Sequence, residues 1–230
     1  MFEFLEFGIC NKFFPGSTLH IVISVFLVAI IGYLLGSLNF GVIISKVFYH
    51  DDIRKHGSGG SGATNMLRTY GKLPAIMTFL GDGVKAAVAV LIGAVILGHN
   101  PMYAGTYIGG LASIIGHAFP IYYGFKGGKS VSSTFFMVLC TEPLIAVICL
   151  VMFIIIVAGT KYVSLGSIMS VLIYPLILYR ITGIPGLHML IAIFTALLVV
   201  YLHRKNIMRL LNGKENKISF KSKKNKEEDK

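Results

Sequence analysis

Long stretches with very few charged residues constrain the fold of this chain more than any other feature. The first runs from His20 to about Phe48, and others begin at Pro74 and at about Tyr103. The chain from Phe135 to Tyr201 is also almost entirely apolar. A helix needs roughly 20 apolar residues to cross the hydrocarbon core of a bilayer. Hydrophobic residues make up 55% of the 230 residues and charged residues only 13%. The sequence therefore predicts an all-α polytopic membrane protein.

The basic residues predict the topology. They concentrate in two short loops and in the C-terminal tail, which is typical of cytoplasmic segments. If both loops and the tail are cytoplasmic, residues 130 to 203 cross the membrane an even number of times. We therefore expect either a split at Glu142-Pro143 or one segment that does not cross. The preferred count is about seven transmembrane helices, some of them short, with the N-terminus outside and the C-terminus cytoplasmic.

Composition also bounds the domain organisation and the partners. Residues 1–220 are expected to form a single integral membrane domain, followed by a lysine-rich disordered tail at residues 221–230. The net charge is +11, and the basic residues responsible for it lie next to apolar segments. This placement favours anionic lipid and phosphate-bearing ligands as partners over nucleic acid. Cys10, Cys140 and Cys149 show no CxxC spacing and predict no disulfide. The N-terminus carries acid before base, unlike a cleavable signal peptide.

A glycine-rich polar loop, Arg54 to Asn65, lies between the first two apolar segments. Its four glycines allow positive φ angles and close approach of the backbone to a ligand. Basic residues and short hydroxyl or amide side chains lie among them, which favours a site for phosphate. A flexible linker between two membrane helices is the alternative, and the loop alone leaves it open.

A second polar loop follows the third apolar segment and reads Gly124-Phe125-Lys126-Gly127-Gly128-Lys129-Ser130. It is not a nucleotide P-loop, because Tyr123 stands where the first glycine is needed and no strand precedes it. A glycine turn and a lysine before the hydroxyl-rich start of a helix still predict an anion site. His203 and Asn206, one helical turn apart where the last segment ends, predict a third wall of that site.

The first apolar segment is broken by the run Gly36 to Gly41, and the second carries Asp82 and Lys85 in its first turns. Ser37 either permits close helix packing or faces the same cavity as the glycine loop. Asp82 and Lys85, spaced i and i+3, can neutralise each other on one helix face. Charges within a membrane usually face a polar interior, so both are expected to support the site from behind.

The sequence lacks the motifs of a serine-nucleophile hydrolase and of a metal site. There is no G-x-S-x-G nucleophile elbow, and no histidine, cysteine or aspartate cluster has the spacing of metal ligands. No cofactor is therefore expected. Three phosphate-binding segments on a lipid-embedded body instead predict a membrane enzyme or carrier that handles two phosphorylated molecules, one of them apolar.

Taken together, the three polar segments resemble the motifs of the PlsY family, the bacterial membrane glycerol-3-phosphate acyltransferases that use acyl phosphate. The first motif corresponds to Gly36-Ser37 with Asp52 to Asn65, and the second to Gly116-His117 with Phe119 to Lys129. The third corresponds to His203, Asn206, Arg209-Leu210, Gly213 and Glu215. The similarity covers nearly the whole chain. The family usually has other residues at a few positions, which in this chain are Asn39, Gly60, Ala86, Ser130 and Leu202.

The resemblance implies seven helices and transfer of an acyl chain to the 1-hydroxyl of glycerol 3-phosphate, giving lysophosphatidic acid and phosphate. It implies a monomer in the bacterial cell (inner) membrane, with the active site on the cytoplasmic side. Its partners are acyl phosphate, glycerol 3-phosphate and membrane lipid. The expected catalytic residues are Ser37, Arg54, Lys129, His203 and Asn206. The expected phosphate-binding residues are Ser58, Gly59, Gly62, Thr64, Asn65, Lys126, Gly127, Gly128 and Glu215.

Two further alternatives remain open on the sequence. A transporter of a phosphorylated metabolite also needs glycine loops and basic residues beside a membrane cavity, but it predicts an inverted internal repeat, which we do not find. A non-catalytic membrane scaffold would use the loops only as linkers. For the acyl transfer, either the phosphate of the donor or His203 is expected to accept the proton of the attacking hydroxyl.

Overall fold

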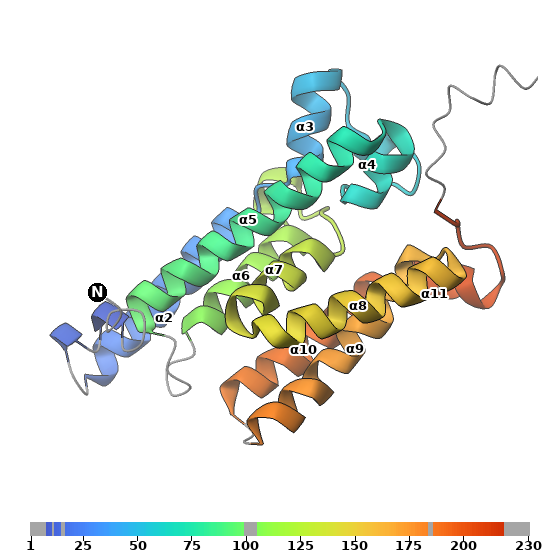
Figure 1. The fold of residues 1–230 in the computed structure, drawn as a ribbon. Helices are drawn as coiled ribbons and strands as arrows, with labels where there is room; N and C mark the ends of the chain where they lie inside the picture. The colour runs from blue at the N-terminus through green and yellow to red at the C-terminus, as the bar shows by residue number, and fades with distance from the viewer. Residues whose placement is uncertain (1–7, 11, 15–16, 99–104, 184–185, 219–230) are drawn as a thin grey trace, which may run out of the picture.

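The computed structural model describes residues 8–218, apart from residues 11, 15–16, 99–104 and 184–185. Within these residues the chain forms helices and no strands, and the long helices pack side by side (Figure 1). The predicted all-helical class is confirmed. The tail at residues 221–230 and the start of the third predicted segment, near Tyr103, lie outside the described residues.

The first apolar segment forms two helices, α2 (Thr18–Gly36) and α3 (Phe40–Tyr49), with the predicted break between them. Asn39 begins α3, because its side-chain oxygen accepts a hydrogen bond from the amide of Val42 at 3.4 Å. The amide nitrogen of the same side chain donates to the hydroxyl of Ser61 at 2.8 Å. The break in the membrane segment is therefore tied to the first polar loop.

Helix α6 (Gly105–Ala118) lies at the centre of the first half of the bundle, between α2 and α5 (Lys72–Leu97). Glycines bring these backbones together. A Cβ atom on Gly36 would lie 2.2 Å from the carbonyl oxygen of Ser113, and one on Gly116 would lie 2.2 Å from that of Tyr33. Small residues allow such contact in membranes, where van der Waals packing holds helices together.

The predicted split at Glu142-Pro143 is confirmed. The short helix α7 (Val131–Thr141) ends there, and Pro143 occupies the first turn of α8 (Pro143–Thr160), where its missing N–H costs nothing. Helices α9 (Val163–Thr182) and α10 (Leu187–Leu202) complete the second half, and α11 (Arg204–Leu211) follows after a bend of 59°. The buried apolar side chains between α7, α8, α9 and α10 include Met137, Ile145, Tyr174, Leu178 and Ala192.

Four of the described helical segments are long and apolar enough to cross a membrane: α2 with α3, α5, α8 and α9. The bent pair α10 and α11 would make a fifth. Helices α6 and α7, with 14 and 11 residues, are shorter than a usual span. The count of about seven and the orientation of the termini stay predictions.

The polar segments gather at one end of the bundle. In Figure 1, α3, α4 (Ala63–Thr69) and α11 lie at the end opposite the label N, beside the start of α7. The first polar loop continues from the short 3-10 helix Ile53–Lys55 into α4, and the second runs from the 3-10 helix Ile121–Tyr123 to α7. Segments far apart in the sequence thus meet, as the predicted common site requires.

Candidate active site

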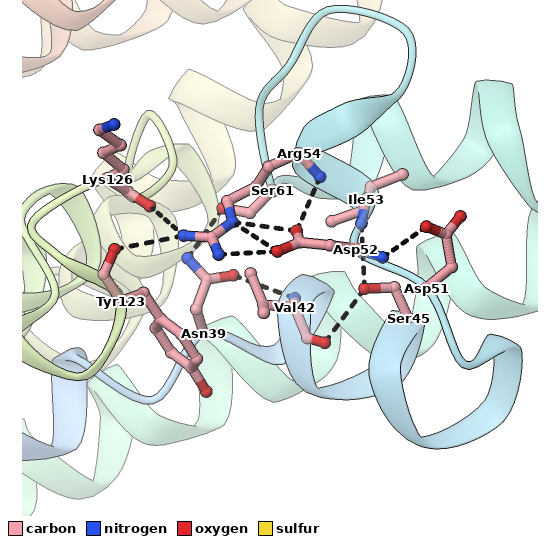
Figure 2. A network of polar contacts seen from close by, with 10 residues as sticks. All are labelled: Asn39, Val42, Ser45, Asp51, Asp52, Ile53, Arg54, Ser61, Tyr123 and Lys126. Carbon is pink, nitrogen blue, oxygen red and sulfur yellow. Dashed lines mark hydrogen bonds and ion pairs between the residues drawn. The ribbon is translucent and has the colours of Figure 1, made fainter.

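The first polar loop is held to the second by Arg54. Its guanidinium donates to both carboxylate oxygens of Asp52, at 2.7 to 3.2 Å, and to the carbonyl oxygens of Tyr123 and Lys126, at 3.2 and 3.4 Å (Figure 2). The hydrogen bond from Arg54 outweighs partial burial and lowers the pKa of Asp52 to about 2, so the pair stays charged. Arg54 therefore joins the two loops, and its five donors are largely occupied.

Asn65 organises the interior of the first loop. Its side-chain oxygen accepts a hydrogen bond from the amide of Ser58 at 3.0 Å. Its amide nitrogen donates to the carbonyl oxygens of Gly60, His56 and Ile53, at 2.7, 2.9 and 3.2 Å. A single buried side chain thus fixes the path of the backbone through the turn.

Only two of the four loop glycines adopt positive φ angles, in part against expectation. These are Gly57, at 55°, and Gly59, at 73°, whereas Gly62 has a φ of −81° and begins α4. At Gly57 the close approach matters as well, since a Cβ atom would lie 2.2 Å from the side-chain oxygen of Asn65. The ordered turn and its contacts show that the loop is more than a flexible linker.

The second loop presents Lys129 to a polar cavity. No hydrogen-bond or ion-pair partner of the Lys129 ammonium is found in the described part of the chain. Burial, with the nearby charges of Arg209 and Arg68, lowers the pKa of Lys129 to about 8, although Glu215 opposes the shift. A partly buried cation without a partner is a natural site for an anionic group of a ligand.

Ser130 adopts a backbone conformation that usually requires glycine. Its φ of 60° lies in the left-handed region. The serine hydroxyl donates to the carbonyl oxygen of Ile114 at 2.9 Å, so the side chain is anchored in this conformation. The loop geometry is thus kept without the glycine.

Glu215, in the third polar segment, is held by three side-chain donors. Its two carboxylate oxygens accept hydrogen bonds from Asn206 at 2.8 Å, from Ser164 at 3.0 Å and from Arg209 at 2.7 Å. Burial raises the pKa of Glu215, but these three donors outweigh it and the net shift is downward. These contacts hold the Glu215 carboxylate beside Asn206 and Arg209, and its expected phosphate-binding role stays a prediction.

His203 lies at the bend between α10 and α11. Its Nδ1 atom is 2.8 Å from the carbonyl oxygen of Val199, which can only accept, so Nδ1 carries the proton. Burial, together with the charge of Lys129, lowers the pKa of His203 to about 4. The ring is therefore neutral at pH 7, and its Nε2 atom is free to accept a proton.

A polar cavity of about 360 Å³ lies between the three segments. The predicted residues that line it are Ser58, Gly59, Gly62, Thr64, Asn65, Gly127, Gly128, Lys129, His203, Asn206 and Glu215. His117, part of the second family motif but not among the expected site residues, also lines it, as do Arg68 and Ser164, which the sequence did not single out. Arg68 carries a signal in the sequence, because it lies one helical turn after Thr64 and so shares its face.

Three predicted residues do not line the cavity. Ser37 is buried behind it, where its hydroxyl donates to the carbonyl oxygen of Tyr33 at 2.8 Å and accepts from the amide of Ile121 at 3.4 Å. Arg54 is occupied by the contacts described above. The side chain of Lys126 is exposed and extends away from Arg54 (Figure 2). Ser37 and Arg54 contribute by holding the backbone.

An apolar cavity of about 140 Å³ adjoins the polar one. The two share Phe79, Val131, Phe153 and Ser167 as lining residues. The apolar cavity continues between α7, α8 and α9, among side chains such as Val138, Leu150 and Val171. A molecule with a phosphate at one end and a hydrocarbon chain at the other would have matching surroundings along its whole length.

Residues 26–213 match the family model described as glycerol-3-phosphate acyltransferase. The chain belongs to the glycerol-3-phosphate acyltransferase family. Relatives that carry this name include one from Clostridioides difficile, 41% identical over 203 residues, which cover 87% of this chain and 98% of the relative. Another, from Halalkalibacterium halodurans, is 42% identical over 200 residues, which cover 85% of this chain and 96% of the relative.

Solved structures of this family agree with the fold. The glycerol 3-phosphate form of PlsY, an integral membrane glycerol 3-phosphate acyltransferase, matches with a TM-score of 0.79 and 34% identity, over 85% of this chain and 96% of that chain. Its lysophosphatidic acid form matches with a TM-score of 0.76 and 33% identity, over 86% and 96%. The predicted membership of the PlsY family and the multi-pass membrane class are confirmed.

Proposed function

We propose that this protein transfers an acyl chain from acyl phosphate to the 1-hydroxyl of glycerol 3-phosphate, the first step of phospholipid synthesis. Membership of the family supports the acceptor and the product. The single observation that carries the donor is the junction of the two cavities, because a polar cavity with an unpartnered cation opens onto an apolar one. Acyl phosphate has an anionic head and a hydrocarbon chain, and fits both.

The phosphate groups of the substrates bind around Lys129 and Arg68, two of the cations that line the polar cavity. Backbone amides of the two loops that have no partner among the described residues, such as those of Gly62 and Gly127, add neutral donors. Arg54 and Ser37 hold the two loops at the distance at which these donors converge. Lys126 remains outside the cavity and is not needed for binding.

The reaction requires no covalent intermediate with the protein. The 1-hydroxyl oxygen of glycerol 3-phosphate forms an ester bond to the acyl carbon, and the bond from that carbon to the phosphate oxygen breaks. The electron pair leaves with inorganic phosphate, and the hydroxyl proton passes either to that phosphate or to Nε2 of His203. Catalysis then rests on bringing two anionic molecules together and on stabilising charge on their oxygens.

His203 and Asn206 orient the acceptor. The contact with Val199 leaves the Nε2 atom of His203 as an acceptor for the attacking hydroxyl. Glu215 accepts from one amide proton of Asn206 and leaves the other for substrate. If His203 is the base, His203→Gln lowers kcat at least about 100-fold; retention of most of kcat would assign the proton to the donor phosphate.

The test is a direct assay with purified protein in detergent. Palmitoyl phosphate and glycerol 3-phosphate are mixed with the protein, and inorganic phosphate and lysophosphatidic acid are measured together. We expect both products in equal amounts, with omission of glycerol 3-phosphate as the control. If folded, monodisperse protein forms no lysophosphatidic acid, the proposal is contradicted. Uptake of labelled glycerol 3-phosphate into proteoliposomes would then support transport.

We further propose that α6 and α7 also cross the bilayer, as short spans, which gives seven. In this arrangement the polar end of the bundle lies on the cytoplasmic side of the bacterial inner membrane, the N-terminus lies outside, and the protein acts as a monomer. Lys126→Cys and Lys214→Cys, both at exposed positions, test the orientation. An impermeant thiol reagent should label them in inverted membrane vesicles and spare them in intact cells; the reverse pattern contradicts it.

A further inference from the structure

Three ionisable side chains meet in the interior behind the polar cavity. Lys85 and Asp82 come from α5 and His117 from the end of α6, and their side chains are at most 4% exposed. The Lys85 ammonium donates to the carboxylate of Asp82 at 2.8 Å and to the carbonyl oxygen of Leu38. It also lies 2.9 Å from Nδ1 of His117. The group thus connects α5, α6 and the break between α2 and α3.

Counting protons fixes the tautomer of His117. An ammonium has three donors and no acceptor, and the three partners of Lys85 use all of them. The Nδ1 atom of His117 must therefore accept, which places the proton of the neutral ring on Nε2. The carboxylate of Asp82 is farther from Nδ1, at 3.4 Å, and is already paired with Lys85.

The Nε2 atom of His117 lies directly beneath the second polar loop. A Cβ atom on Gly128 would be only 2.2 Å from it, so the ring packs against the backbone beside Lys129. The amide of Gly128 donates to the carbonyl oxygen of His117 at 3.1 Å, which holds the loop over the ring. His117 lines the polar cavity, and none of the described residues accepts a hydrogen bond from Nε2.

We infer that His117 presents a fixed Nε2–H donor to a negatively charged oxygen of the substrate bound at the second loop, and that Lys85 and Asp82 are positioning residues for it. This deepens the proposed acyl transfer and rests on it. His117 and His203 then have opposite roles: the ring of His203 offers an acceptor to the cavity, and the ring of His117 offers a donor. His117 cannot act as the base in this state.

Two reciprocal substitutions test the donor. In His117→Gln the side-chain amide nitrogen reaches the place of Nε2, so the donor is kept. In His117→Asn the side chain ends near the place of Nδ1, so its oxygen can still accept from Lys85 but the donor is lost. Removing one donor to a developing oxyanion typically costs about 100- to 1000-fold in kcat. We expect His117→Gln to retain most of the activity and His117→Asn to lose at least tenfold.

The kinetic split identifies the oxygen. An increase in KM for one substrate with kcat nearly unchanged assigns the donor to that substrate's phosphate, whereas a fall in kcat with both KM values unchanged assigns it to the acyl carbonyl oxygen. Equal activity of the two variants, or greater activity of His117→Asn, overturns the inference.

The tautomer can be measured without activity. Nitrogen NMR of ¹⁵N-histidine-labelled protein in nanodiscs distinguishes protonated from unprotonated ring nitrogens, and the His117→Gln spectrum identifies the His117 signals. We expect a protonated Nε2 in the wild type and a shift toward protonated Nδ1 in Lys85→Met, where Asp82 becomes the partner of the ring. A protonated Nδ1 in the wild type overturns the inference, even if acyl transfer is observed; the expected tautomer without acyl transfer would contradict only the proposed function.

Discussion

The two polar loops contain similar residues, but the cation of the first is bound by other protein groups and the cation of the second is not. In the first loop, Arg54 is bound to Asp52 and to two carbonyl oxygens of the second loop. In the second loop, Lys129 faces the cavity, with no partner found in the described part of the chain. One loop therefore uses its charge to hold the structure, and the other leaves its charge available to a ligand. The contrast shows that residue type alone does not reveal which cation is engaged by the protein itself.

The largest expected effect concerns two lysines of the same loop. Lys129→Ala removes a partly buried cation that has no partner among the described residues, and we expect kcat/KM to fall about 100- to 1000-fold, because such donors act in a site with little water. Lys126→Ala is the matched control, since its side chain is exposed outside the cavity. We expect its kcat/KM to stay within about twofold of the wild type. Similar losses in both variants would remove the distinction between them.

The sequence predicted the fold well where glycine, proline or polar residues clearly interrupt an apolar segment. The break after Gly36 and the split at Glu142-Pro143 both occur where expected. It also predicted that the three polar segments meet, because a common side of the membrane follows from the distribution of basic residues.

The roles of individual residues within the site were harder to predict. Arg54 and Lys129 are both basic residues in glycine-rich loops, and only the fold shows that Asp52 occupies one of them. Glu215 is expected in the phosphate site from the family resemblance, and only the fold shows that its oxygens accept hydrogen bonds from Asn206 and Arg209. Such contacts depend on side-chain direction across a bend, which helical spacing does not specify.

The second prediction tests the first loop as a scaffold. Asn65→Ala leaves three carbonyl oxygens and one amide of the loop without their partner. An unsatisfied buried polar group costs about 1–3 kcal/mol. We therefore expect kcat/KM to fall roughly 10- to 100-fold, together with a lower melting temperature. Thr64→Ala, which also faces the cavity, serves as the control and should leave the melting temperature unchanged.

A third prediction concerns the guanidinium group of Arg54. Arg54→Lys keeps the charge but loses the paired contacts with Asp52 and the reach to the second loop. We expect kcat/KM to fall about tenfold, since a charge-assisted hydrogen bond contributes about 1.5–3 kcal/mol. Asp52→Asn should reduce activity by a similar amount, because it breaks the same contact from the other side. If Asp52→Asn is fully active while Arg54→Lys is not, Arg54 binds substrate directly.

The smallest expected effect is a dependence on pH. The lowered pKa of Lys129, about 8, means that the cation is present below pH 8 and is lost as the pH rises through that value. Glycerol 3-phosphate is already a dianion above pH 7, as its second pKa is about 6. We expect kcat/KM, which reports the free enzyme, to fall a few-fold between pH 7 and 8.5. Lys129→Arg, whose guanidinium does not titrate here, should flatten this fall.

The buried group behind the cavity also bears on how the protein enters the membrane. Inserting a single charged residue at the centre of a helix costs roughly 2.5–3.5 kcal/mol. Asp82 and Lys85 lie one turn apart on α5 and are paired at 2.8 Å, so the helix carries its own counter-charge before any neighbour arrives. The positioning pair can therefore pass through the translocon as a neutral unit, and the later arrival of α6 adds His117 to a partner that is already in place.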